Sequence, residues 1–543
     1  MPAVARAPRR ARRSGLGRSP LTAAALSLAL VLGAVGCSSD DDASDDTATT
    51  TSAAGTGDQT TDTGTDAEAE GERGLPPERD RPDGPAATVV GELTAGGGVA
   101  LTDIKLPDLA GNGFVEHEYA VEGTATSYVV DDVATDLPGS GEFTLTEGDT
   151  ADYRTRMVVR RPEKPEDFNG TVVVEWLNVS GGLDANPDWM YLADEILRGG
   201  YAWVGVSAQH IGVEGGPVAV RVGAAGDLAG KGLKAMVPER YGELSHPGDA
   251  YSYDIYTQVS RALRQSGADG PLGGLEAEAI IAAGESQSAF ALTTYANGVQ
   301  PLTREFDAFF VHSRGGGAQG LGTEGGGEQI SSAIGSESTR IRTDVGVPVL
   351  MLQSASDVVG LLGYFAARQD DTDHIRLWEV AGTAHVDRYM LGPIADTMEC
   401  GTPINDGPMH WAAKAALRHL DTWARGGDAP PEAPRYEVDE SGTDPAYVRD
   451  EDGIVEGGIR TPWVDVPVQV HSGQAAPGGS VACLLMGSTV DLPADTLADR
   501  YPSEDEYLAA FEAAADAAIE SGFVLADDRD AMLGDARSDL LAG

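Results

Sequence analysis

Short apolar runs alternate with amphipathic segments through the middle of the chain. Six of these runs have the length and composition of buried strands and lie at 171–176, 201–206, 279–283, 306–311, 347–352 and 375–380. Apolar residues recur at helical spacing in the intervening and following segments 189–198, 253–264 and 410–423. Because strands that alternate with helices are usually buried on both faces, this pattern predicts a mostly parallel sheet covered by helices on both sides. The alternation over 89–159 predicts an N-terminal β-rich portion.

Two long segments, 209–248 and 313–346, interrupt this alternation. Both exceed the usual length of a connection between elements. Each leaves the carboxyl end of a predicted strand, which is the edge where open α/β sheets bind ligands. We therefore predict that these two cap segments cover the functional site. The tail 459–543 mixes strand-like pieces with a helix predicted around 506–519.

The first 36 residues are typical of an export signal. Six arginines precede or flank the apolar run 21–35, which is too short to span a bilayer comfortably. Cys37 follows directly, and the segment 34–37 is similar to a bacterial lipoprotein processing box, with Ala34 where leucine is usual. We therefore expect Cys37 to carry a lipid anchor and the protein to be an exported membrane lipoprotein that faces outward. Secretion after cleavage near Cys37 is the alternative.

The segment 37–85 is rich in Asp, Thr, Glu and Gly and has almost no apolar residues, so it is predicted to be a disordered tether. The remaining residues, 86–543, are predicted to form one α/β domain with a C-terminal extension. The formal charge of the chain is −48, and removing the six arginines of the signal takes it to −54. A surface this acidic repels nucleic acid, which excludes DNA or RNA as a partner.

The segment 284–288, Gly-Glu-Ser-Gln-Ser, joins an apolar strand to a helix predicted over 289–296. A serine on such a tight strand-to-helix turn has a strained backbone, so the residues two before and two after it must be small. Gly284 and Ser288 meet this requirement. The free amides at the start of the helix face any negative charge that develops near the serine. This pattern predicts that Ser286 is a catalytic nucleophile.

A nucleophilic serine needs a base to take its proton and an acid to orient that base. In a parallel sheet all three groups lie beyond the carboxyl ends of strands, in the order serine, acid, histidine. Asp357 and His385 each follow a predicted strand at this edge, whereas the aspartates at 370, 371 and 373 precede a strand. The other histidines start a strand, lie on a late helix or stand in the wrong order. We therefore predict the triad Ser286, Asp357 and His385.

Two backbone amides are needed to stabilise the oxyanion of the tetrahedral intermediate. The amide of Gln287 is one, and the other is expected from the loop 177–182, at Asn178 or Val179. A simple glycine-rich turn is the alternative interpretation of that loop. Asp387 is interpreted as a solvated loop charge. Arg314 is interpreted as a solvated surface side chain, with contact to a substrate carboxylate as its alternative.

The cysteines and the known ligand motifs narrow the chemistry further. If Cys37 carries lipid, Cys400 and Cys483 remain, and two thiols outside the cytoplasm usually form a disulfide. Two buried free thiols are the alternative. There is no His-Glu-x-x-His and no pair of Cys-x-x-Cys motifs, so no metal is expected. The glycine-rich stretch 315–320 lacks the following helix that dinucleotide binding requires, so no cofactor is expected.

The Ser286 turn, the loop acid Asp357 and the Gly-Thr-Ala-His segment ending at His385 resemble those of α/β-hydrolases. More narrowly, the chain is similar to bacterial exported proteins described only as "α/β-hydrolase domain-containing", on the stretches 168–182, 457–463 and 501–503. The resemblance covers roughly residues 89–530 and implies an α/β-hydrolase fold with serine hydrolase chemistry, but no particular substrate. Ser288 departs mildly from the glycine that is usual after such a serine.

These observations predict an exported serine hydrolase that acts on a small-molecule or polymer carboxylic ester. Acyl transfer to a cell-envelope acceptor would use the same triad and is an alternative. A catalytically silent binding lipoprotein is another, although nothing in a binding role requires all three triad residues. The sequence leaves the ester, the acyl length and the oligomeric state open.

Overall fold

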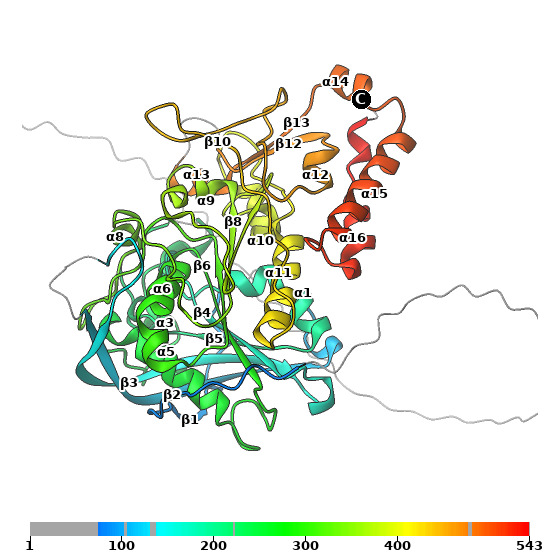
Figure 1. Cartoon of the computed structure of the whole chain (residues 1–543). Coiled ribbons are helices and arrows are strands. Elements are labelled where there is room, and N and C mark those ends of the chain that lie inside the picture. The colour runs from blue at the N-terminus through cyan, green and yellow to red at the C-terminus, as the bar shows by residue number, and fades with distance from the viewer. Residues whose placement is uncertain (1–73, 103–105, 131–136, 221–222, 476–479, 542–543) are drawn as a thin grey trace, which may run out of the picture. The chain divides into compact units, whose positions relative to one another are not determined.

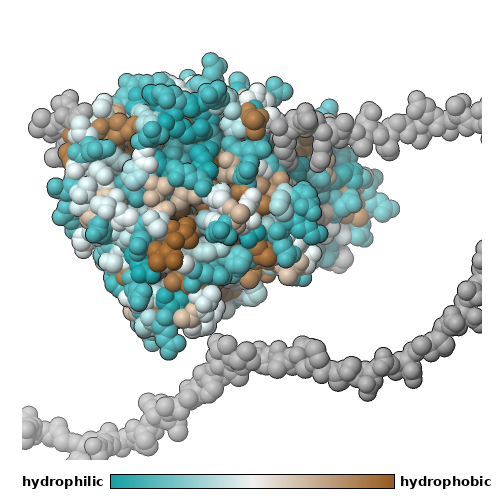
Figure 2. All heavy atoms as spheres, turned by 90° about the horizontal axis from the view of Figure 1, so that it is seen from below, coloured by the Kyte–Doolittle hydropathy of each residue, from teal (hydrophilic) through white to brown (hydrophobic). Residues whose placement is uncertain are grey.

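The computed structural model describes residues 74–102, 106–130, 137–220, 223–475 and 480–541. The predicted signal, the expected lipid anchor at Cys37 and the tether up to residue 73 lie outside these residues. No helix within the described part of the chain is long and apolar enough to cross a membrane. The face shown in Figure 2 is mostly hydrophilic, with hydrophobic residues in small separate groups.

A nine-stranded mixed sheet organises the described residues (Figure 1). Its strands are Thr88–Glu92 (β1), Phe114–Val130 (β2), Leu145–Pro162 (β3), Thr171–Trp176 (β4), Ala202–Val206 (β5), Ala279–Glu285 (β6), Ala308–His312 (β7), Val349–Ser354 (β8) and Ile375–Val380 (β9). Across the sheet their order is β1-β2-β3-β5-β4-β6-β7-β8-β9. The six strands from β5 to β9 in this order are parallel, while β1, β2 and β3 are antiparallel. The predicted β-rich portion is therefore a long hairpin that extends the parallel sheet.

The α-helices are Pro187–Gly199 (α1), His210–Glu214 (α2), Gly232–Met236 (α3), Pro238–Tyr241 (α4), Ser252–Arg264 (α5), Gln287–Thr294 (α6), Gln300–Thr303 (α7), Ile330–Ile334 (α8), Ala355–Val358 (α9), Arg388–Leu391 (α10), Met409–Ala424 (α11), Pro462–Asp465 (α12), Val481–Met486 (α13), Ala494–Arg500 (α14), Glu504–Glu520 (α15) and Arg529–Gly534 (α16). Along the chain, α1, α5 and α6 lie between strands of the large sheet, and α11 and α15 follow its last strand, β9. Two small antiparallel sheets pair Val438–Asp439 (β10) with Ala446–Tyr447 (β11), and Gln469–Ser472 (β12) with Ser488–Asp491 (β13).

Helices cover both faces of the parallel sheet, as predicted. Helices α5 and α6 lie on one face and α1 and α11 on the other (Figure 1). Strand β4 shows why such a strand is mostly apolar. Val172, Val174 and Trp176 pack on the α5 and α6 side, whereas Val173 packs on the α1 and α11 side. Side chains that alternate between two buried faces leave no position for a solvated residue.

The helix after Ser286 does not end near residue 296, so the predicted end of the helix over 289–296 is wrong. It continues from α6 through a π-helical turn, Tyr295–Val299, into α7. Gly298 is a packing residue here, because a Cβ at this position would lie 2.4 Å from the Phe143 ring and 2.7 Å from Leu145. The close approach of the β2–β3 side of the fold therefore explains this glycine.

Residues 74–85, which the sequence assigned to the tether, contact the body of the domain. The side chains of Arg79 and Arg81 both bind the Asp307 carboxylate, which is fully buried and also pairs with Arg264. Arg425 donates to the carbonyl oxygen of Gly74. A segment poor in apolar residues is held here by charge-assisted hydrogen bonds rather than by hydrophobic burial.

The C-terminal extension has a small hydrophobic core of its own. Helices α12, α15 and α16 enclose Phe511, Tyr507 and Met532, and Trp411 from α11 joins this cluster. In Figure 1 α15 and α16, drawn in red, come after the β12–β13 pair in the chain, whereas α12, drawn in orange, comes before it. The indole of Trp411 therefore links the extension to a helix that packs on the main sheet.

Candidate active site

Ser286 lies between β6 and α6 with the strained backbone that the sequence predicts. Its φ is 57° and its ψ is −118°, a conformation that non-glycine residues rarely adopt. A Cβ on Gly284 would lie 3.0 Å from the Ser288 Cβ, so both neighbours must be small. The turn lifts Ser286 beyond the carboxyl end of β6 and ties its amide to the His312 carbonyl at 3.0 Å.

The structure brings Ser286, His385 and Asp357 into one hydrogen-bonded chain. His385 Nε2 lies 2.8 Å from Ser286 Oγ, and His385 Nδ1 lies 2.6 Å from Asp357 Oδ1. Asp357 sits in α9 directly after β8, and His385 sits in the loop after β9. The second oxygen of Asp357 accepts from the Ser354 amide at 2.6 Å and hydroxyl at 2.7 Å, which fixes the carboxylate. All three side chains are buried, with residue exposures of 6% for Ser286, 3% for His385 and 0% for Asp357.

Two of the three residues considered for the oxyanion hole retain an available amide. Gln287 is the first residue of α6, so its N–H has no partner within the helix. The amide of Asn178 instead donates to the Ala185 carbonyl at 2.9 Å, so Asn178 is not available as a donor. The amide of Val179 points to the Ser286 turn and donates to the Gln287 side-chain oxygen at 3.3 Å. This long bond is one that an incoming oxyanion could replace.

Asn178 has a different role, which depends on its side chain. Its Nδ2 donates to the Glu285 carbonyl at 3.1 Å, and its Oδ1 accepts from the Ser180 amide at 2.9 Å. The loop after β4 is therefore fastened to the end of β6, directly before Ser286. Because Asn178 fixes the loop, it also fixes the direction in which Val179 presents its amide.

Buried titratable groups surround the triad, and the sequence analysis did not find them. Glu285 is 3% exposed, and its Oε1 lies 3.2 Å from His385 Nε2. Burial raises the pKa of Glu285 to about 7, against the opposing effect of His385 and His312. His312 Nδ1 pairs with Asp188 Oδ1 at 2.9 Å, and burial lowers the pKa of His312 to about 4. The signal available in the sequence was the position of Glu285, directly before the nucleophile.

Two side chains that the sequence analysis placed in solvent are fully buried. Asp387 caps α10 by accepting from the Met390 amide at 2.9 Å. Arg314 donates to the carbonyl oxygens of Gly315 at 3.0 Å and Gly316 at 3.2 Å, and burial lowers its pKa to about 10. A guanidinium has five donors in a planar fork, so Arg314 can hold the glycine-rich turn that begins the second cap segment.

Both predicted cap segments meet beside the oxyanion loop. A small cavity of about 10 Å³, enough for about one water molecule, lies next to Val179 and Gln287. Its other walls include Ile211 and Pro217 from the first cap segment and Ile330 from the second. The two cap segments therefore meet next to the start of α6, directly after Ser286.

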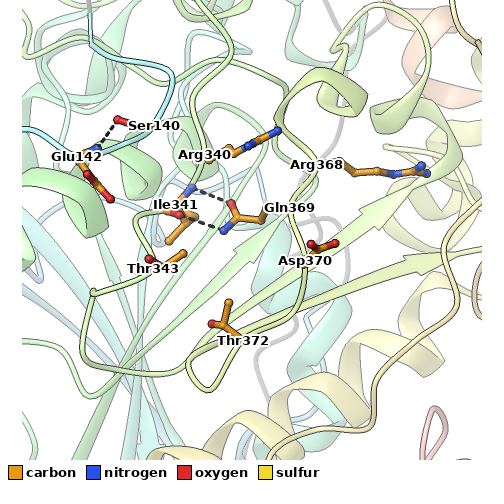
Figure 3. A pocket seen from close by; sticks show the side chains of 9 residues that line it. All are labelled: Ser140, Glu142, Arg340, Ile341, Thr343, Arg368, Gln369, Asp370 and Thr372. Atoms are coloured by element: carbon orange, nitrogen blue, oxygen red, sulfur yellow. Dashed lines mark hydrogen bonds between the residues drawn. The ribbon is translucent and has the colours of Figure 1, made fainter.

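A cavity of about 480 Å³ lies elsewhere, at the amino ends of β8 and β9. Figure 3 shows its lining, which includes Arg340, Gln369 and Thr372. The amide and carbonyl groups of Ile341 bond to the Gln369 side chain there, at 2.9 and 3.0 Å. Because strand directions are shared across the parallel sheet, this cavity is at the edge opposite Ser286 and includes no triad residue.

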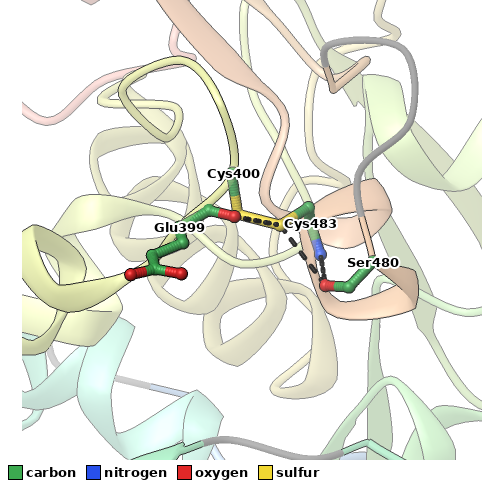
Figure 4. Close-up of a disulfide and its surroundings, with 4 residues drawn as sticks. All are labelled: Glu399, Cys400, Ser480 and Cys483. Atoms are coloured by element: carbon green, nitrogen blue, oxygen red, sulfur yellow. Dashed lines mark hydrogen bonds between the residues drawn. A yellow bond between two sulfur atoms is a disulfide. The ribbon is translucent and has the colours of Figure 1, made fainter.

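Cys400 and Cys483 form the disulfide that the sequence predicts, across 83 residues (Figure 4). Cys483 is on α13, and Ser480 caps this helix by accepting from the Cys483 amide at 3.3 Å. The following residues brace the loop that carries His385, because the amide of Val386 donates to the Leu485 carbonyl at 2.9 Å. The loop that carries His385 is thus held from outside by the disulfide-linked helix.

A second set of bonds connects the same region to both catalytic loops. Asn405 donates through its amide to the Met486 carbonyl at 2.9 Å and through Nδ2 to the Gly382 carbonyl at 3.0 Å. The Ser356 hydroxyl, next to Asp357, donates to the Gly473 carbonyl at 2.6 Å. The C-terminal extension therefore supports the acid as well as the base.

A mostly parallel sheet whose carboxyl edge carries a strained serine, a histidine and an aspartate defines the α/β-hydrolase class. The chain matches the family described as "Alpha/beta hydrolase domain" over residues 82–534, and it belongs to that family. This confirms the predicted resemblance and fold class. A search of the curated proteins finds no match.

Solved structures with similar chains include several esterases. Fungal esterases from Rhizomucor miehei share 11% identity, with 57% of this chain and 85% of that chain covered and a TM-score of 0.27. An α/β serine hydrolase without lid from Xanthomonas campestris shares 13% identity, with 54% and 94% covered and a TM-score of 0.27. A glucuronoyl esterase from Solibacter usitatus shares 9% identity, with 57% and 85% covered and a TM-score of 0.25.

Proposed function

We propose that this α/β-hydrolase is a serine hydrolase that cleaves carboxylic esters. The observation that carries the proposal is the continuous chain from Ser286 Oγ through His385 to Asp357, with bonds of 2.8 and 2.6 Å. A fold alone does not imply an activity, but this arrangement has the geometry of an activated nucleophile.

The reaction follows from the positions of these groups. Ser286 Oγ attacks the ester carbonyl while His385 Nε2 takes the hydroxyl proton. The developing oxyanion accepts from the amides of Gln287 and Val179, which displaces the Gln287 side chain from the Val179 amide. His385 then gives the proton to the leaving alcohol. Water, activated by His385 in the same way, attacks the acyl-enzyme and releases the carboxylic acid.

Asp357 is proposed to hold His385 in the tautomer that leaves Nε2 free to accept a proton. Its geometry suits this role, because both of its oxygens are engaged and neither faces solvent. The charge of the carboxylate also stabilises the imidazolium that forms during the attack.

Covalent labelling with a fluorophosphonate probe tests the proposal. Wild-type protein should be labelled on the peptide that contains Ser286, and Ser286→Ala should abolish both labelling and ester turnover. Ser288→Ala is a matched control, because Ser288 lies on the same peptide, is fully buried and can be replaced by another small residue. Labelling that persists in Ser286→Ala, or none in the wild type, would contradict the proposed nucleophile. Analysis of products with and without an added alcohol separates hydrolysis from acyl transfer.

A further inference from the structure

The catalytic imidazole lies between two carboxylates. Asp357 faces Nδ1, and Glu285 Oε1 lies 3.2 Å from Nε2, the same nitrogen that approaches Ser286 Oγ. Among the described residues, Glu285 Oε1 has no hydrogen-bond partner, so its contact with His385 is electrostatic. A second carboxylate at Nε2 is not required by a serine triad, and it competes with the serine for the proton on that nitrogen.

Among the described residues, the charged groups that act on Glu285 are two histidines and two aspartates. His312 pairs with it in register across β6 and β7, Asp188 approaches from α1, and Asp357 approaches from α9. Burial keeps the pKa of His312 at about 4, so this imidazole is neutral at physiological pH. His385, from the loop after β9, is therefore the group that can carry a positive charge beside Glu285.

Glu285 and His385 change each other's pKa. Burial lowers the pKa of His385, but the charges of Glu285 and Asp357 outweigh this effect and raise it to about 9. An imidazolium cannot accept the serine proton, so an ionised Glu285 keeps His385 inactive near neutral pH. Burial raises the pKa of Glu285 to about 7, which makes it able to accept a proton there.

We propose that Glu285 is a positioning residue for the proton of His385. In the resting state the proton lies on Nε2 of the imidazolium, beside the ionised carboxylate. Its transfer from Nε2 to Glu285 Oε1 leaves a neutral carboxylic acid and a neutral imidazole. The lone pair on Nε2 is then free to accept the Ser286 proton. No further reactant is needed, because one proton moves between two groups already in contact. This inference rests on the proposed function.

The variant Glu285→Gln tests it through the pH profile of kcat/KM. A neutral amide cannot stabilise the imidazolium, so the pKa of His385 should fall toward the ordinary value of about 6.5. The acid limb of the profile should then move to lower pH by at least about one unit, a tenfold change in the protonation equilibrium. Glu285→Asp, which withdraws the carboxylate by one methylene group, should move the limb only partway.

Glu175→Gln is the matched control. Glu175 is a fully buried carboxylate on the neighbouring strand β4, and it accepts from Trp203 Nε1 at 2.8 Å instead of contacting His385. Its replacement should leave the acid limb in place. A limb that moves equally in Glu175→Gln and Glu285→Gln, or in neither, would overturn the proposal.

NMR titration of the His385 imidazole gives a readout that does not need turnover. The imidazolium should persist to about pH 9 in the wild type and be lost at lower pH in Glu285→Gln. An unchanged titration would refute the role of Glu285 even if the enzyme is active. If the wild type is neither labelled nor active but the titration shifts as expected, the proposed function fails and the coupling of Glu285 to His385 stands.

Discussion

Removal of the disulfide should weaken both the fold and the catalytic site. The perturbation is the double variant Cys400→Ala, Cys483→Ala. The bond closes a loop across 83 residues. In the chain-entropy treatment this constrains the unfolded chain by about 15 cal/mol/K, or about 4.6 kcal/mol at 25 °C. Both cysteines are buried, so alanine also leaves a small loss of packing, and a total destabilisation of about 4–6 kcal/mol is expected.

The assay is denaturant unfolding followed by tryptophan fluorescence, together with ester turnover well below the transition. Turnover should fall because α13 braces Val386, next to His385, through the bond to Leu485. Phe511→Ala is the control, since it removes a buried ring from the C-terminal cluster and should cost about 3–5 kcal/mol without touching the catalytic loops. Destabilisation below about 1 kcal/mol would refute the entropic argument. Full turnover in the cysteine variant would contradict the inference that α13 holds the loop that carries His385.

Two more changes separate catalytic from structural roles. Asp357→Asn should preserve the thermal melting temperature within a few degrees but lower kcat by about 10²–10⁴-fold, because the imidazole loses its orienting charge; unchanged turnover would mean that another group is the acid. Asp307→Asn should free Arg79 and Arg81, so trypsin should cut faster after Arg79, whereas Arg81 is followed by proline and is not a trypsin site. The loss of a buried partner should cost about 3–5 kcal/mol. Ester turnover should stay the same, because Asp307 precedes β7 at the edge away from Ser286; equal cleavage rates would contradict the anchoring contact.

Local patterns in the sequence were enough to predict most of the sheet and the arrangement around Ser286. Strands β4 and β9 have the predicted bounds, because mostly apolar runs of strand length admit few alternatives in a parallel sheet. The structure brings Ser286, Asp357 and His385 together because each follows a strand at the same edge. Chain order and strand direction suffice for such a prediction, without knowledge of any contact.

The remaining features depend on contacts between distant residues, which one sequence does not reveal. From the sequence alone Arg79 is expected to be solvated, because its partner Asp307 is 228 residues away along the chain. The sequence does not show that the amide of Asn178 is engaged by the Ala185 carbonyl, so Asn178 is a candidate oxyanion donor on the sequence alone. Arg314 follows a strand like a surface residue, yet the glycine-rich turn wraps around its guanidinium. In each case the partner of a polar group is set by the tertiary structure, and local periodicity in the sequence does not predict such a contact.

The Asp307 anchor also decides from which side the enzyme can be attached. Arg79 contacts Asp307, which lies just before β7. Gly74 contacts Arg425, which in turn pairs with Glu278 just before β6. Ser286 follows the opposite end of β6, a strand of seven residues that spans roughly 20 Å. A carrier surface or fusion partner joined ahead of Gly74 would thus meet the rear of the enzyme. The carboxyl end of β6, where Ser286 lies, would then face away from the point of attachment.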